Sequence, residues 1–201
     1  MKIVKQINLS WLSGSLALLL AVMAAPVLAD DVTDSIREAT EAYESGDIAG
    51  AVDSLNYAVQ LLQQMKGASL VELLPDAPEG WEAEEAESAS VGAAMFGGGL
   101  TASRSYRKEK SSVDIQIVTD SPMLQGMMAM FTNPMFAASS GGKMTKINKQ
   151  KAILKYDKAA NDGEIQIVVK NRYMVTVSGD NVSEEELTAF VEAMDFDKFA
   201  D

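Results

Sequence analysis

Apolar residues recur at helical spacing from about residue 30, which predicts two amphipathic helices. The first stripe is Val32, Ile36, Ala39 and Tyr43, and the second is Ile48, Ala51, Val52, Leu55, Ala58, Val59 and Leu62. Ser45-Gly46-Asp47 interrupts the pattern with a glycine that can adopt positive φ. Lys66 and Gly67 are typical C-terminal signals. The pattern predicts an antiparallel helical hairpin over residues 30–68.

The hydrophobic period changes to two after residue 99, as expected for strands with one buried face. The alternation predicts a β-hairpin over 100–118, a second over 152–169 that turns at Asn161-Asp162-Gly163, and a further strand over 173–177 after a turn at Asn171. The two β-hairpins resemble each other at an offset of fifty residues, since DIQIV at 114–118 matches EIQIV at 164–168. A duplicated unit of this kind would form one antiparallel sheet with helices on one face.

The chain ends in a predicted helix. Ser183 with Glu186 three residues later forms a capping box. The expected buried stripe of this helix is Leu187, Phe190, Val191 and Met194. The fold class is therefore predicted as α+β. A helical hairpin is followed, in residues 69–201, by an antiparallel sheet on which a Met-rich helix and the C-terminal helix pack.

The Met-rich helix is predicted after Ser121 as N-cap and Pro122 at the first helical position. Its segment, 121–136, is apolar nearly all round through Met123, Leu124, Met127, Met128, Met130, Phe131, Met135 and Phe136. Core packing would turn Leu124, Met128 and Phe131 toward the sheet. An adaptable surface for a partner or for lipid would use Met127, Met130, Met135 and Phe136. A Cu(I) site would use the thioethers of Met123, Met127 and Met130.

The first 29 residues have the pattern of a secretory signal peptide. Lys2 and Lys5 precede an apolar run over 16–25, and small or short apolar residues end at Ala29. Cleavage is expected after Ala29, with the product in the periplasm. The run is about half the length of a membrane span, which favours a cleaved signal peptide over an uncleaved anchor, and no span is expected in the cleaved product.

Composition excludes several chemistries. The chain has no Cys and no His and a formal net charge of −12. Thiol nucleophiles, Ser-His-Asp systems and the usual zinc ligand sets are therefore excluded. The negative charge argues against binding to nucleic acid or anionic lipid. No catalytic residue and no cofactor is predicted.

Two short segments resemble known families. Gly46, Ile48, Ala51, Leu55 and Ala58 resemble the ladder of one tetratricopeptide repeat. A single repeat has no neighbours to bury its faces, so the hairpin is expected to pack on the rest of the chain or on a second copy. Pro78-Glu79-Gly80-Trp81, the strands and the closing helix are similar to the PsbP/Mog1-like class of small α+β domains over 72–199. That resemblance implies binding to other proteins.

Together these patterns predict an exported, non-catalytic adaptor or binding module of the cell envelope with a protein partner. Self-association through the helical hairpin is the other partnership that the sequence allows. The alternative function is a periplasmic carrier of copper or of a small apolar ligand through 121–136. A carboxylate-based hydrolase is the third. The predicted parts are a signal peptide (1–29), a helical hairpin (30–68) and an α+β domain (69–201).

Overall fold

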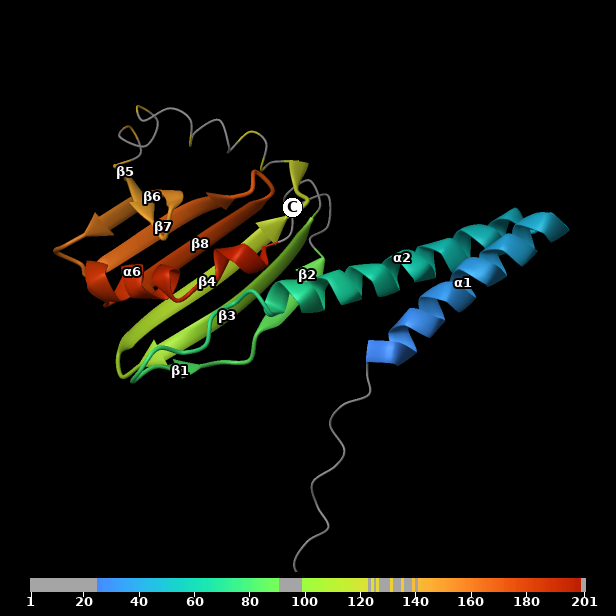
Figure 1. Cartoon of the computed structure of the whole chain (residues 1–201), viewed down its shortest axis with the longest axis horizontal. Helices are drawn as coiled ribbons and strands as arrows, with labels where there is room; N and C mark the ends of the chain where they lie inside the picture. The colour runs from blue at the N-terminus through green and yellow to red at the C-terminus, as the bar shows by residue number, and fades with distance from the viewer. Residues whose placement is uncertain are drawn as a thin grey trace, which may run out of the picture.

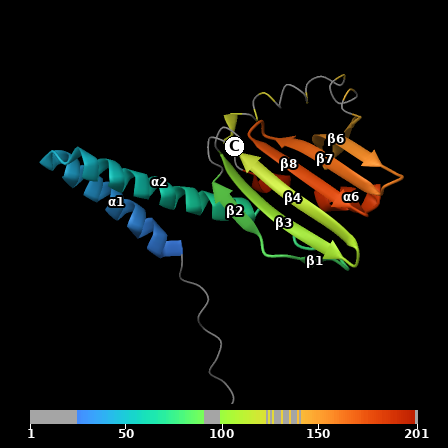
Figure 2. The same ribbon diagram turned by 180° about the vertical axis from the view of Figure 1, so that it is seen from behind.

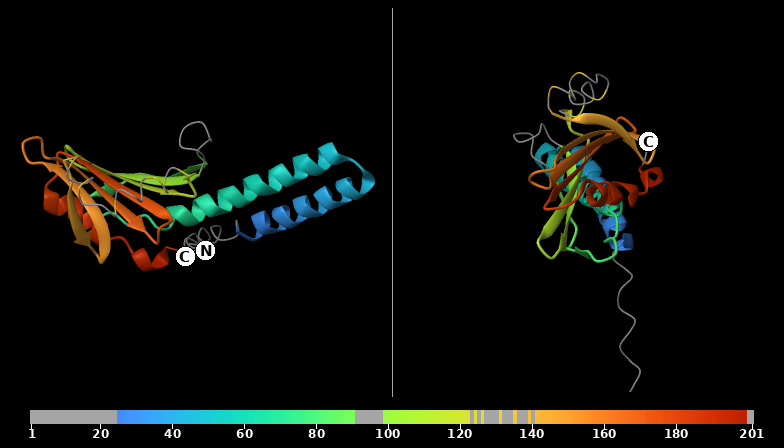
Figure 3. Two further views of the ribbon diagram at one scale, coloured as in Figure 1. Left: turned by 90° about the horizontal axis from the view of Figure 1, so that it is seen from above. Right: turned by 90° about the vertical axis from the view of Figure 1, so that its left-hand side faces the viewer.

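Two long antiparallel helices project from one end of an α+β domain (Figures 1 and 3). The computed structural model describes residues 25–90, 99–122, 124, 126, 131, 135, 139 and 141–199. The helices are α1 (Ala25–Ser45) and α2 (Ile48–Val71), and an antiparallel sheet and a C-terminal helix follow. The predicted α+β class is confirmed.

The predicted break between the helices is confirmed. Gly46 has a φ of +86°, and the Asp47 carboxylate caps α2 by accepting a hydrogen bond from the Gly50 N–H at 3.0 Å. Helix α1 begins at Ala25, so the expected cleavage site after Ala29 lies within its first two turns. Cleavage itself stays a prediction.

The predicted end of α2 at Lys66 and Gly67 is wrong. The helix continues to Val71, and its C-cap, Glu72, remains right-handed. Gly67 is buried against β2 (Glu87–Ser90), where an added Cβ would lie 2.8 Å from Ser88 Oγ. This glycine allows a strand to approach the helix closely. The sequence alone does not distinguish a glycine at such a contact from a glycine that ends a helix.

In the described part of the chain, eight strands form one antiparallel sheet in the order β1-β3-β4-β8-β7-β6-β5, with β2 also paired to β3. The remaining strands are β1 (Glu82–Ala83), β3 (Leu100–Lys108), β4 (Ser111–Thr119), β5 (Lys143–Ile147), β6 (Gln150–Asp157), β7 (Asp162–Val169) and β8 (Tyr173–Asp180). Both predicted β-hairpins and the strand after Asn171 are confirmed. Strands β1 and β2 escaped prediction because all their residues are exposed and show no alternation.

The main core lies between the sheet and α6 (Glu184–Glu192), with the 3₁₀ helix η2 (Phe196–Lys198) beside it. The predicted stripe is confirmed, since Leu187, Phe190, Val191 and Met194 are at most 2% exposed. The Phe190 ring meets Trp81 edge-on and Tyr106 at a tilt, each with centroids 4.9 Å apart. These three rings join α6, the segment before β1 and β3.

Two paired glycines let α6 approach the sheet closely. Gly163 of β7 pairs with Gly179 of β8 directly below Leu187. A Cβ on Gly163 would lie 2.8 Å from one Leu187 methyl carbon, and a Cβ on Gly179 would lie 2.9 Å from the other. The absence of side chains at both positions therefore creates the space for Leu187.

The prediction that helices cover only one face of the sheet is wrong. Leu124 and Phe131, each 5% exposed, pack against Ile153 and Met174. These strand residues alternate with the core-facing ones, so they belong to the face opposite α6, which Figure 2 presents. The expectation that Leu124 and Phe131 face the sheet is confirmed, while Met128 lies outside the described residues.

The two similar β-hairpins are not arranged as copies of one unit. Strands β4 and β7 both pair antiparallel with β8, but β3 and β6 lie on the outer sides of them in mirror order. No rotation can superpose the two hairpins while keeping both strand direction and buried face. The shared DIQIV/EIQIV pattern reflects two strands that border the same central strand and bury the same face.

Candidate interaction surface

The contact between α1 and α2 is built mainly from small side chains, together with the buried Leu61. Ser35 and Ala39 of α1 and Ala51 and Ala58 of α2 are at most 6% exposed. Such residues let two helices approach closely, but they use little of the apolar surface that the helices carry. Most of the larger apolar side chains are consequently left outside the hairpin contact.

Those outer side chains form one surface, which we call the apolar hairpin face. It consists of Ile36 and Tyr43 of α1 and Ile48, Val52, Leu55, Val59 and Leu62 of α2, each between 48% and 69% exposed. At about 100° per residue, both stripes lie roughly 70–100° from the contact row of their own helix and in the same rotational sense. Because the helices are antiparallel, this rotation brings both stripes to the same side of the hairpin.

The α2 part of the apolar hairpin face has the spacing of a coiled-coil seam. Ile48, Val52, Leu55, Val59 and Leu62 are separated by intervals of four, three, four and three residues. In heptad notation Val52 and Val59 occupy a positions, and Leu55 and Leu62 occupy d positions, so all four belong to one apolar seam. This seven-residue period within the wider predicted stripe was the signal that could have identified these residues as a binding surface.

Charge is distributed unevenly around the hairpin. The only charged residue of α2 between positions 48 and 65 is Asp53, which lies outside the seam. The seam is flanked by uncharged residues at the e and g positions: Ala49, Asn56, Gln63, Ala51, Ala58 and Met65. From residue 30 on, α1 carries six acids and one base, Arg37, whose guanidinium lies 2.8 Å from Asp34. The apolar hairpin face is thus an uncharged surface on a strongly acidic arm.

The sequence-predicted partner and copper residues are mostly outside the described residues. This applies to Met123, Met127, Met130 and Phe136. Met135 is described and is 78% exposed. The described residues contain no group of three or more carboxylate, imidazole or thiol side chains that could hold a metal ion. The partner surface in 121–136 and the Cu(I) site stay predictions.

The face of the sheet opposite α6 is polar where the Met-rich segment does not cover it. One row runs across five strands through Ser105, Asp114, Ser178, Glu164 and Lys155. Lys155 Nζ lies 4.0 Å from the Glu164 carboxylate, so the two charges partly neutralise each other. An open depression of about 450 Å³ at the end of this row is also lined by acidic side chains, among them Asp157, Asp162 and Glu164.

A second depression, of about 380 Å³, lies between the β5–β6 turn and the end of α6. Its acids include Glu192, Asp195 and Asp197, with Lys149 opposite. The Asp195 carboxylate already accepts a hydrogen bond from the Asp197 N–H at 3.1 Å, as the cap of η2. Its role is thus explained by helix capping.

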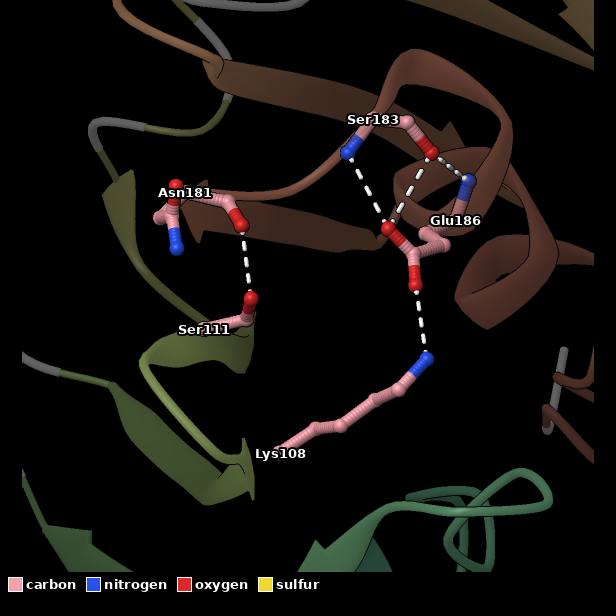
Figure 4. A network of polar contacts seen from close by, with 5 residues as sticks. All are labelled: Lys108, Ser111, Asn181, Ser183 and Glu186. Atoms are coloured by element: carbon pink, nitrogen blue, oxygen red, sulfur yellow. Dashed lines mark hydrogen bonds and ion pairs between the residues drawn. The ribbon is translucent and has the colours of Figure 1, made fainter.

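A polar network fixes α6 to the β3–β4 turn (Figure 4). The Glu186 carboxylate accepts hydrogen bonds from Lys108 Nζ at 3.0 Å and from the Ser183 N–H at 3.2 Å, which confirms the predicted capping box. These bonds lower the pKa of Glu186, chiefly through Lys108. The Lys108 ammonium also lies 5.7 Å from the Trp81 ring centroid. An acid held ionised in this way is the opposite of a general acid.

Two core-facing side chains of β3 meet one carbonyl. The Tyr106 hydroxyl donates to the Pro75 carbonyl at 2.6 Å, and Arg104 Nη1 donates to the same oxygen at 3.1 Å. Burial raises the pKa of Tyr106 to about 12. Arg104 Nε is buried without a hydrogen-bond partner among the described residues. These bonds anchor the segment between α2 and β1 to the sheet.

Comparisons with known proteins found no family model, no curated protein and no solved structure that matches this chain. The hairpin helices, of 21 and 24 residues, are longer than the pair that fits in a tetratricopeptide unit of about 34 residues. Within the described residues, no helix has both the length and the apolar character that a membrane crossing requires.

Proposed function

We propose that this protein is an exported, non-catalytic binding module of the cell envelope that engages a protein partner through the apolar hairpin face. One observation carries the proposal: a projecting arm (Figure 3) carries seven large apolar side chains that are each about half exposed or more, and helical spacing places them on one side of it. Contiguous apolar surface of this size on a soluble protein is typical of a binding site.

The position of the acids supports export and cleavage. A chain that begins at Asp30 would place Asp30, Asp31 and Asp34 in the first turns of α1. Negative charge at a helix N-terminus interacts favourably with the helix dipole. Removal of residues 1–29 would therefore leave a well-terminated helix.

The net charge of −12 on the whole chain favours a protein partner over nucleic acid or an anionic bilayer. The apolar hairpin face is uncharged and its spacing is that of a helix-packing seam. The copper or apolar-ligand carrier and the carboxylate-based hydrolase have no comparable support among the described residues.

Photo-crosslinking in the producing cell tests this function. A photoreactive amino acid would replace Leu55 in the apolar hairpin face or, as the matched control, Tyr57. The two side chains are 49% and 52% exposed but lie on opposite sides of α2. We expect a protein adduct from position 55, in the periplasmic fraction, and little from position 57.

The absence of any protein adduct at position 55, or equal adducts at both positions, would refute this function. Amino-terminal sequencing of the same sample tests export, and we expect a chain that begins at Asp30. Full-length chain retained in washed membranes would contradict that part of the proposal.

A further inference from the structure

We infer that the partner on the apolar hairpin face is a second copy of this chain, and that the two hairpins form a four-helix bundle. The inference rests on the proposed function and specifies its partner. It is carried by three features of α1 and α2: the charge pattern, the seam and the apolar area.

The charge pattern removes the main obstacle to self-association. Two chains of net charge −12 repel each other wherever their charged surfaces meet. The seam of α2 carries no charge at its a, d, e or g positions, and its one acid, Asp53, lies outside. Contact between two α2 seams therefore brings no like charges directly together.

The same pattern argues against a foreign helix as the preferred partner. Coiled-coil partners are commonly selected by complementary charges at the e and g positions. Here those positions are Ala, Asn, Gln and Met, which supply no electrostatic code for a different chain. A self-complementary apolar seam is satisfied by an identical seam related by a two-fold axis.

The apolar area is sufficient for a stable dimer. Seven large side chains that are each about half exposed present on the order of 700 Å² per chain, so complete burial of two faces would remove at most about 1,400 Å². Stable protein interfaces bury roughly 1,200–2,000 Å² in total.

The two-fold axis is expected to lie perpendicular to the helices. The α+β domain occupies the end of the hairpin where α2 leaves it, as Figure 3 shows. An antiparallel bundle would place the two domains at opposite ends, whereas a parallel bundle would crowd them at one end. The middle of the seam, near Leu55 and Val59, then lies close to the axis.

Sedimentation equilibrium of the purified chain tests the inference. We expect twice the mass of one chain, which is 21.5 kDa before any processing. Leu55→Glu buries a carboxylate in the interface and should weaken the dimer at least a hundred-fold. Tyr57→Glu adds the same charge to the opposite side of α2 and should leave the dimer unchanged. Circular dichroism of both variants checks that the helices persist.

Single cysteines give a second measurement, because the natural chain has no Cys. Leu55→Cys, near the axis, should form a disulfide-linked dimer on mild oxidation, and Tyr57→Cys should remain a single chain. This measurement does not require the Leu55→Glu variant to fold.

A monomer at about 100 µM, or equal effects of Leu55→Glu and Tyr57→Glu, would overturn the inference. A monomer whose position-55 adduct in cells contains a different protein would overturn the second copy but leave the proposed function intact. A monomer with no position-55 adduct would overturn both the second copy and the proposed function. Seam-dependent binding of the monomer to phospholipid vesicles would also overturn it, with a bilayer as the occupant.

Discussion

The hairpin and the α+β domain both contain an amphipathic helix with an N-cap, but the apolar stripe is buried in one and exposed in the other. In α6, Leu187 and Phe190 are at most 1% exposed, while in α2 the equivalent stripe residues Val52 and Leu55 remain 49–50% exposed. A sheet lies opposite the first stripe, and no described residue covers the second. Amphipathic spacing therefore predicts that a helix face needs a cover, but the spacing does not say what provides the cover.

The difference has an energetic consequence. A buried large side chain contributes about 1.5–3 kcal/mol to folding relative to an exposed one. The α+β domain gains this contribution within one chain, whereas half of it is still available at each position of the apolar hairpin face. The hairpin should therefore be the less stable region in a monomer and gain most from assembly.

Truncation of the main core should produce the largest effect. Phe190→Ala removes a ring that contacts both Trp81 and Tyr106. We expect a loss of about 3–5 kcal/mol in the free energy of unfolding, as for other buried aromatic truncations. Urea denaturation followed by Trp81 fluorescence measures it. A loss below about 1 kcal/mol would mean that the domain does not depend on this core.

Adjacent leucines in α2 test the comparison within one helix. Leu61 lies on the side of α2 that faces α1 and is only 4% exposed. Leu62 lies on the apolar hairpin face and is 49% exposed. Leu61→Ala should destabilise the hairpin by about 2–4 kcal/mol, and Leu62→Ala by less than about 1 kcal/mol in dilute monomer. Thermal unfolding followed at 222 nm distinguishes them. Equal effects at low concentration would show that both sides of α2 are covered within one chain.

A larger residue at Gly163, where α6 packs on the sheet, should have an intermediate effect on stability. A Cβ on Gly163 would lie 2.6 Å from the Tyr156 ring and 2.8 Å from Leu187, so Gly163→Ala should cost about 1–3 kcal/mol. Gly126→Ala is the control, because a Cβ there meets no atom of the described residues within 4 Å. Chemical denaturation of both variants compares them. A neutral Gly163→Ala would mean that α6 is free to shift away from the sheet.

The smallest effect should come from the Glu186 network, whose side chain is 38% exposed. Glu186→Gln should cost less than about 1 kcal/mol at neutral pH, because solvent screens the pair. The pKa of Glu186 is lowered in the folded state, so its contribution is present above the ordinary pKa of 4.5 and is lost as the pH falls through the lowered value. Stability curves of both proteins should converge in acid. A gap that widens on acidification would contradict this assignment.

Much of the fold could be predicted because local signals agreed with tertiary contacts. The break at Gly46, the capping box at Ser183 and both long β-hairpins follow from spacing and turn chemistry. Strands β1 and β2 could not be predicted, since they are short, fully exposed and defined only by pairing with β3. The prediction of where α2 ends was wrong for a related reason, because the role of Gly67 depends on its contact with β2, a strand about twenty residues later in the chain.

The candidate surface was predicted in part. The sequence showed the wide stripe of α2 and allowed self-association, but it also expected the rest of the chain as a cover. Only the structure divides that stripe into a buried row of small residues, such as Ala51 and Ala58, and an exposed row of large ones.

By itself the sequence determined where the hairpin helices, the long strands and the C-terminal helix lie and which chemistries are excluded, because periodicity, caps and composition are local properties. The tertiary structure decided which faces are covered. Leu124 and Phe131 lie on the sheet face opposite α6, and the large residues of the hairpin have no cover among the described residues. Burial is a relation between segments that are distant in the chain, and no local pattern encodes the identity of the segment on the other side.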